Sequence, residues 1–130
     1  MIVLQTLKNV KETVGASLML ITHDMAVQAE VVDMLGIMYA GKIVEQGSIV
    51  HVFKEPLHPY TDKLISAFPS ILGPKRELSS IHGFPPDLLN PPPGCRFHPR
   101  CNYAKEICKI EEPSTKKPGE DHYVACHLIS

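Results

Sequence analysis

The sequence predicts an α/β fold in its first half and a mostly irregular, cysteine-containing segment in its second half. The first observation is an alternation of helical and extended apolar patterns between residues 2 and 68. The second is the distribution of proline, because ten of the 12 prolines occur at Pro69 or later. Alternating helices and strands are typical of a parallel sheet covered by helices. We therefore expect one domain part over residues 1–68 and another over residues 69–130.

The first elements should be a helix and a buried strand. Over residues 2–14 apolar side chains recur at i, i+4, i+7 and i+11, which places one apolar stripe on a helix. Gly15 can end this helix, since glycine takes the left-handed conformation at little cost. The apolar run Leu18–Ile21 is short enough for a strand that is buried on both faces.

A second helix should follow the triplet Thr22-His23-Asp24. Thr22 or Asp24 can cap its free N–H groups with a side-chain oxygen, and its apolar side extends from Met25 to Met34. His23 then lies at the carboxyl end of a buried strand, which is the edge where ligands bind in open α/β sheets.

Two strands and two short helices should complete the first part. The apolar run Leu35–Ala40 and the segment Lys42–Gln46 read as strands joined by a tight turn. Ser48 can cap a short helix that ends before Pro56. The next helix should begin at Pro59. Its expected core face consists of Leu64, Ile65 and Phe68.

Residues 70–94 are expected to be irregular, because they contain turn signals and a run of three prolines. Two interpretations remain open for this segment. It is either a free linker or a segment that packs across the domain surface through its apolar side chains. Those apolar residues are Leu72, Leu78, Ile81, Phe84, Leu88 and Leu89.

Composition limits the class of protein. The chain has 130 residues, which is about one domain, a hydrophobic fraction of 44% and a formal net charge of -1. This charge gives no argument for nucleic-acid binding. The sequence contains neither an apolar run of about 18 residues, as a membrane span needs, nor a secretory pattern at its start. We expect a cytoplasmic chain whose membrane association comes through a partner.

The four cysteines are candidates for ligation. They are Cys95, Cys101, Cys108 and Cys126, spaced C-x5-C-x6-C-x17-C. Structural zinc sites usually contain C-x2–4-C pairs, whereas iron–sulfur clusters tolerate varied spacing. In a reducing compartment, ligation is favoured over disulfides, and unligated thiols in a small core remain an alternative.

Other polar residues surround these cysteines. His98 or His127 could replace one cysteine in a zinc site, although a role beside the site is favoured with four thiols present. His82 and His122 belong to the same histidine-rich region. Four basic residues either form a solvated face or offset the charge of four thiolates. They are Arg96, Arg100, Lys105 and Lys109.

Three parts of the sequence, in this order, resemble the ATP-binding subunits of ABC transporters. The first comprises Ile21–Asp24 and Met38–Gly47, which is similar to the H-loop region of that family. The second, Glu55–Thr61, resembles a segment of its oligopeptide/dipeptide branch. The third comprises Pro93–Cys101 and Val124–Leu128, which resemble the cysteine-containing extension of that branch. The resemblance implies the C-terminal fragment of a P-loop ABC ATPase domain, followed by this extension.

The resemblance also implies site residues and cofactors. The histidine that matches His23 contacts the γ-phosphate of Mg-bound ATP and helps to position the attacking water, a task that suits an imidazole. Asp24 is expected to be a helix cap rather than a catalytic base. The four cysteines match the positions that carry a 4Fe–4S cluster in this branch, with zinc as the alternative metal.

The implied partners are a second ATP-binding subunit and transmembrane permease subunits, so the chain is expected on the inner face of the cell membrane. The solute could be a peptide, nickel or another small molecule. The sequence contains no GxxxxGK(S/T) phosphate-binding loop, and the resemblance places that loop before Met1. By itself the chain should therefore lack ATPase activity and should self-associate through the unpaired strand at Leu18–Ile21.

Two alternatives from other functional classes remain open at this point. One is a stand-alone module that binds a metal or an iron–sulfur cluster without any ATP chemistry. The other is a regulatory interaction domain in which the cysteines are structural. Nucleotide binding separates the transporter interpretation from both, and analysis for iron and sulfide separates the two modules from each other.

Overall fold

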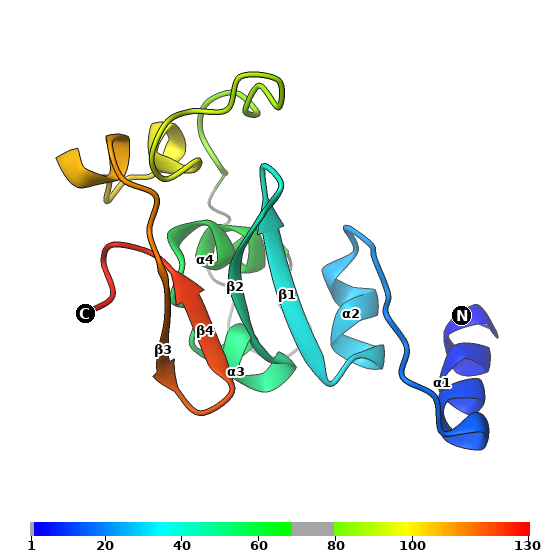
Figure 1. Cartoon of the computed structure of the whole chain (residues 1–130). Coiled ribbons are helices and arrows are strands. Elements are labelled where there is room, and N and C mark those ends of the chain that lie inside the picture. Colours follow the sequence, from blue (N-terminus) through cyan, green and yellow to red (C-terminus); the bar gives the residue numbers. More distant parts are fainter. Residues whose placement is uncertain (1, 69–79) are drawn as a thin grey trace. The chain divides into compact units, whose positions relative to one another are not determined.

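The computed structural model describes residues 2–68 and 80–130, and the chain forms two compact units that divide between Asp33 and Met34. The first unit contains the helices α1 (Ile2–Val14) and α2 (Met25–Val31). The second contains a four-stranded sheet and the remaining helices (Figure 1). Helices combined with a sheet confirm the predicted α/β class.

The first unit confirms the predicted helix and its end. Gly15 has a φ of 64°, and its N–H donates to the carbonyl oxygen of Lys11 over 3.1 Å. Lys11 also forms an ion pair with Asp33. The apolar stripe of α1 is exposed, with Val3 71% and Val14 69% accessible. This helix therefore contributes little buried area within its own unit.

The strand predicted at Leu18–Ile21 is wrong. Residues 16–22 form neither helix nor strand, and Met19 and Ile21 are 87% and 89% exposed. No strand in the described part of the chain pairs with this segment. An apolar run becomes a buried strand only when neighbouring strands satisfy its backbone groups, and the run itself does not provide those neighbours.

Helix α2 begins as expected and ends early. The Asp24 carboxylate accepts hydrogen bonds from the N–H groups of Ala26 and Val27, over 3.0 and 3.2 Å, so Asp24 is the cap. The helix ends at Val31, and Met34, predicted on its apolar side, instead begins the first strand. The spacing of apolar residues alone does not distinguish the end of a helix from the start of an apolar strand.

The predicted hairpin is confirmed. Strand β1 (Met34–Tyr39) and strand β2 (Lys42–Ser48) pair in antiparallel fashion through a two-residue turn. The turn residues Ala40 and Gly41 have φ values of 48° and 79°, as a turn that matches the strand twist requires. Alternate residues of β1 are buried, so one face of the hairpin belongs to the core.

The other two strands come from the segment that was predicted to be mostly irregular. Strand β4 (His122–Ala125) pairs with β2, and β3 (Thr115–Gly119) pairs with β4, giving the order β1-β2-β4-β3. Every pair is antiparallel, so the expected parallel sheet is wrong. For two of the three pairs, β1–β2 and β3–β4, the reason is local, because short turns join only antiparallel strands.

Two helices, α3 (Ile49–Lys54) and α4 (Pro59–Ser66), lie on one face of this sheet in Figure 1. Ser48 caps α3 as predicted, since its hydroxyl accepts the N–H of His51 over 3.2 Å.

The predicted core face of α4 is wrong at Phe68, which lies beyond the helix and is 39% exposed. Leu64 and Ile65 are half-buried, and the fully buried residues of α4 are Pro59, Thr61 and Lys63. The first turn of the helix packs close to Phe97 in the cysteine segment. A contact so distant in the sequence cannot be predicted from the spacing of apolar residues within the helix.

The segment before the cysteines is irregular where it is described. Residues 80–94 contain no helix or strand. Phe84, Leu88 and Leu89 are 91%, 71% and 90% exposed, so these three do not pack across the domain surface. The predictions for Leu72 and Leu78 lie outside the described residues.

Two 3-10 helices follow, η1 (His98–Arg100) and η2 (Glu106–Lys109).

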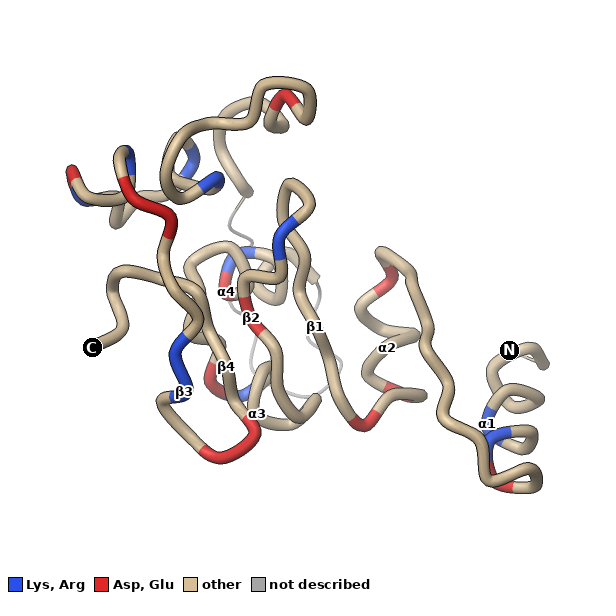
Figure 2. The backbone as a smooth tube through the Cα atoms, viewed as in Figure 1, with Lys and Arg blue, Asp and Glu red and all other residues tan. Residues whose placement is uncertain are grey.

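Acidic and basic residues are interspersed along the backbone in Figure 2. Among the described residues, no helix has the length and apolar character needed to cross a membrane.

Candidate functional site

His23 lies in the bend that precedes α2, and its side chain is exposed. Thr22 supports this bend, because its hydroxyl accepts the N–H of Asp24 over 3.1 Å, and its carbonyl oxygen accepts the Gln28 side chain over 2.9 Å. The backbone at His23 is thus held on both sides while the imidazole is free to meet a ligand. Asp24 is engaged as a cap, as expected.

The four predicted cysteines line a single pocket in the second unit. Cys95 and Cys101 flank η1, Cys108 lies in η2, and Cys126 directly follows β4. All four are free thiols; Cys108 and Cys126 are buried, and the other two are half-buried. The fold therefore brings together side chains that are up to 31 positions apart in the sequence.

Close backbone packing holds two of these cysteines together. The N–H of Cys95 donates to the carbonyl oxygen of Cys108 over 2.8 Å. Gly94 has a φ of +69°, and a Cβ at this position would lie 2.4 Å from the same carbonyl oxygen. Only glycine fits here, because any side chain would both clash and strain the backbone.

A backbone N–H donates to each of the four sulfur atoms. Lys105 N–H donates to the Cys108 sulfur over 3.4 Å. The other three sulfurs receive the N–H of the residue two positions later, namely Phe97, Tyr103 and Leu128. Such N–H groups stabilise negative charge on sulfur, which is why they accompany thiolate ligands of metals and clusters.

Burial raises the pKa of the Cys95, Cys101 and Cys126 thiols, and the neighbouring cysteines raise it further, whereas the N–H groups act in the opposite direction. As free groups these thiols are therefore held neutral and unreactive. Formation of four thiolates at this place would need a bound cation, because four like charges repel one another in a buried pocket.

The free volume enclosed by the pocket is only about 10 Å³, so side chains fill the space between the cysteines. Within residues 2–68 and 80–130, no group of three or more His, Cys, Asp or Glu side chains is placed to hold one metal ion. His98 and His127 line the pocket but are bonded to the carbonyl oxygens of Cys95 and Glu111, each over 2.8 Å.

An aromatic cluster forms one side of the pocket. Phe97 is 1% exposed, and its ring lies 5.1 Å from that of Tyr39 and 5.3 Å from that of Tyr60. The His58 ring lies 5.7 Å from the same phenyl ring. The Tyr39–Phe97 pair is edge-to-face, an arrangement that adds to the burial energy. The cluster fixes the cysteine segment against β1 and the start of α4.

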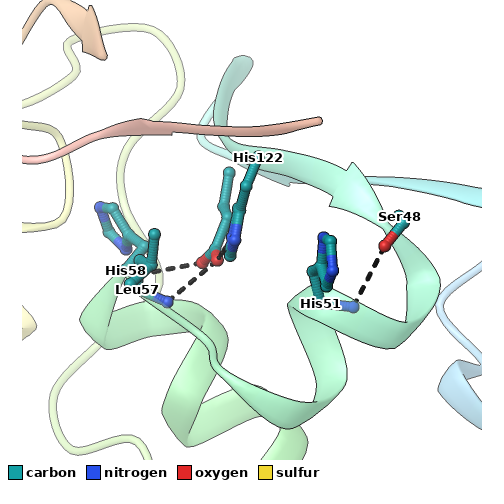
Figure 3. A network of polar contacts seen from close by, with 6 residues as sticks. Ser48, His51, Leu57, His58 and His122 are labelled. Carbon is teal, nitrogen blue, oxygen red and sulfur yellow. Dashed lines mark hydrogen bonds and ion pairs between the residues drawn. The ribbon is translucent and has the colours of Figure 1, made fainter. Parts of the chain in front are cut away.

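A buried carboxylate joins β2, β4 and α4. Glu45 is 1% exposed; one oxygen accepts the N–H of Leu57 over 2.9 Å and lies 2.6 Å from Nε2 of His122, and the other accepts the N–H of His58 over 2.9 Å. Figure 3 shows these contacts, with the His58 ring directed away from His122. Full hydrogen bonding is what makes such a charge tolerable in a core.

The start of α4 contains buried polar atoms that have no partner among the described residues. They belong to residues that are 1%, 0% and 8% exposed, and the atoms are Nε2 of His58, Oγ1 of Thr61 and Nζ of Lys63. Burial lowers the pKa of His58 to about 4, although Glu45 opposes this shift. The His58 ring is therefore neutral at physiological pH.

Three of the four basic residues near the cysteines have structural partners. Arg96 donates to the carbonyl oxygen of Ala40, and Arg100 donates to the Tyr39 hydroxyl over 3.3 Å. Lys109 pairs with Glu106 over 2.7 Å. A simple solvated face is therefore not a sufficient description, because both arginines connect the cysteine segment to the hairpin.

Sequence reasoning missed Glu45, His58 and Lys63 as members of the site. Glu45 gave one signal, an acid directly after the apolar pair Ile43-Val44 of a predicted strand, which suggests a buried partner. His58 stands in the motif Glu55–Thr61, but its ring was assigned no role. Lys63 gave no signal at all, because a lysine on a short helix normally points to solvent.

The fold and the pocket together define an α/β protein that carries a buried four-cysteine site of structural character. The chain belongs to the family described as the C-terminal region of oligopeptide/dipeptide transporters, whose profile matches residues 44–108. This confirms the family resemblance seen in the sequence.

Named relatives cover almost the whole chain. It is 46% identical over 126 residues to the dipeptide transport ATP-binding protein DppD of Caldanaerobacter subterraneus, covering 97% of this chain and 39% of that protein. It is 40% identical over 128 residues to the oligopeptide transport ATP-binding protein OppD of Bacillus subtilis, covering 98% and 36%. The chain thus spans less than half the length of the curated relatives it matches.

Proposed function

We propose that this chain acts as the C-terminal part of an ATP-binding subunit of a peptide ABC importer. The observation that carries the proposal is the match over 97% of the chain to a protein named for dipeptide transport and ATP binding. In this reading residues 1–68 belong to the ATP-binding domain and residues 69–130 form the extension. Its partners are a second ATP-binding subunit and permease subunits, which hold it at the inner face of the membrane.

His23 is the catalytic residue in this proposal. Its exposed imidazole, held between Thr22 and Asp24, contacts the γ-phosphate and positions the attacking water. Phosphoryl transfer also needs Mg²⁺ and a loop that binds the phosphates, and the sequence has no motif for that loop.

The test replaces His23 in a complete ATP-binding subunit. His23→Ala should reduce ATP turnover strongly while ATP binding is kept, because the histidine acts on the transferred phosphate and not on the base. The exposed His82 is a matched control, so His82→Ala should retain turnover. Normal turnover in His23→Ala would remove the histidine from the mechanism.

The second part of the proposal is that Cys95, Cys101, Cys108 and Cys126 hold a 4Fe–4S cluster. Four free thiols in one pocket, each with an N–H donor, fit the ligand set of such a cluster. The cysteine side chains would rotate to admit it, since little free volume lies between them. When bound, a cluster supplies a cross-link and one-electron redox capacity. The chain's residues bind it, exclude water and donate hydrogen bonds to its sulfurs.

Anaerobic purification followed by iron and sulfide analysis tests this part. We expect brown protein with near-equal amounts of iron and sulfide, and Cys108→Ser should lower both while leaving α1 and α2 intact. Zinc in place of iron, with no sulfide, would support the alternative metal. A cluster in a complete subunit that fails to bind ATP would favour a cluster-binding module without ATPase chemistry.

A further inference from the structure

The start of α4 presents a hydrogen-bond donor of fixed identity at the cysteine pocket. His58 lines the pocket, and its Nδ1 accepts the N–H of Tyr60 over 3.0 Å. Because a backbone N–H only donates, Nδ1 must be the unprotonated nitrogen, and the neutral ring carries its proton on Nε2. This Nε2–H is buried and has no partner in the described part of the chain.

An unsatisfied donor at this depth is costly, since a buried polar group without a partner loses its hydration and gains no hydrogen bond in return. The other buried donors of the helix point to the same requirement. Lys63 is 8% exposed with no partner for its ammonium group among the described residues, and its positive charge acts on the Cys101 thiol. His58 lines the pocket and Lys63 acts on Cys101, so both uncompensated donors are placed to serve an acceptor at the cysteines.

We propose that His58 and Lys63 are positioning residues for the cysteine-bound group, with the Nε2–H of His58 donating to a cluster sulfur or cysteine thiolate and Lys63 balancing negative charge. This inference rests on the cluster of the proposed function and extends it to two residues that are not ligands. Neutral thiols would be poor acceptors for both donors, whereas four thiolates around a cluster supply strong ones.

The proposal predicts a definite direction for the reduction potential. One-electron reduction of a 4Fe–4S cluster adds one negative charge to the pocket. Hydrogen bonds to sulfur and nearby positive charge stabilise the reduced state and so raise the potential. Removal of either donor should therefore shift the potential to more negative values, without any change in the four ligands.

Two substitutions at His58 separate its two nitrogens. In His58→Asn the side chain can still accept the N–H of Tyr60, as asparagine does at helix starts, but it has no donor at the Nε2 position. In His58→Gln the amide nitrogen can reach the Nε2 position, and the cap is lost instead. The potential of the reconstituted protein is measured by dithionite titration monitored by electron paramagnetic resonance.

We expect a more negative potential in His58→Asn and a value near that of the unchanged protein in His58→Gln. Lys63→Met should also be more negative, and Lys63→Arg should restore the potential. Lys109→Met is the matched control, because this exposed lysine neighbours Cys108 but pairs with Glu106, and its potential should not move. Thermal unfolding of each variant identifies any that fail to fold, and iron content shows that the cluster is retained.

Equal potentials in the unchanged protein, His58→Asn and Lys63→Met would overturn the inference while leaving the cluster in place. So would a shift in His58→Gln as large as that in His58→Asn, because it would assign the effect to the cap. If the unchanged protein binds no iron or sulfide after anaerobic reconstitution, both this inference and the cluster of the proposed function fail.

Discussion

Replacement of Glu45 by alanine should destabilise the second unit more than any surface change. The substitution removes the acceptor of two backbone N–H groups, those of Leu57 and His58, and the partner of the His122 ring. Each buried donor left unpaired costs about 1–3 kcal/mol. Relief of the desolvation of the carboxylate offsets part of this sum, so we expect a loss of about 3–5 kcal/mol, as for one partner of a buried ion pair.

Urea unfolding followed by circular dichroism and tyrosine fluorescence measures the loss, since the chain contains no tryptophan. Glu112→Ala is the matched control, because Glu112 pairs with Lys42 of β2 over 3.0 Å but is 59% exposed. An exposed pair contributes no more than about 1 kcal/mol. Hydrogen exchange should show faster exchange at the amides of Leu57 and His58 in Glu45→Ala.

The reasoning is refuted if Glu45→Ala and Glu112→Ala unfold at the same urea concentration. Glu45→Gln gives a further check on the cause. It keeps an acceptor oxygen but places an amide NH₂ among three donors, so its loss should lie between those of the control and alanine. A larger loss in Glu45→Gln than in Glu45→Ala would indicate that repulsion between donors, and not the missing acceptor, sets the cost.

Three other predictions follow from particular residues. The pKa of His58 is lowered by burial from 6.5 to about 4. The unfolded imidazole binds the proton first, so the metal-free chain should lose about 3 kcal/mol of stability as the pH falls through that window. Urea titrations between pH 7 and 4 should show a smaller slope in His58→Asn than in the unchanged chain. Gly94→Ala should lower the free energy of unfolding by more than about 1 kcal/mol, because its Cβ would lie 2.4 Å from a carbonyl oxygen. A thiol reagent should then label Cys95 and Cys108 faster, and unchanged labelling would contradict the packing described. The isolated chain should self-associate through its exposed apolar segment, in which Ile21 is 89% accessible. Light scattering should therefore give a mass that rises with protein concentration and that is lower for Ile21→Lys. A monomer at high concentration would argue against self-association.

The sequence predicted the elements whose cause is local. Helix α1 follows from the helical spacing of its apolar residues, and its end at Gly15 follows from the ability of glycine to adopt a positive φ. The cap at Asp24 and the β1–β2 hairpin follow from short-range hydrogen bonds and turn geometry. In each case the atoms that determine the structure lie within a few residues of one another, so the pattern contains the information.

The predictions failed where the determining partner is distant. The run Leu18–Ile21 has the composition of a buried strand but no neighbour within the described residues. Strands β3 and β4 join the sheet because β4 finds the edge of β2, about 75 residues earlier in the chain. No local period encodes that pairing, so the segment read as irregular.

For the site, the sequence by itself singled out the candidate residues: a histidine before a helix and four cysteines of unusual spacing. Only the tertiary structure decided that the four thiols share one pocket and that His58 and Lys63 are buried beside them. It also decided that Glu45 is buried at the junction of β2, β4 and α4. The physical reason is that burial and charge pairing depend on contacts between helices and strands. These contacts form only after strands distant in the sequence have paired.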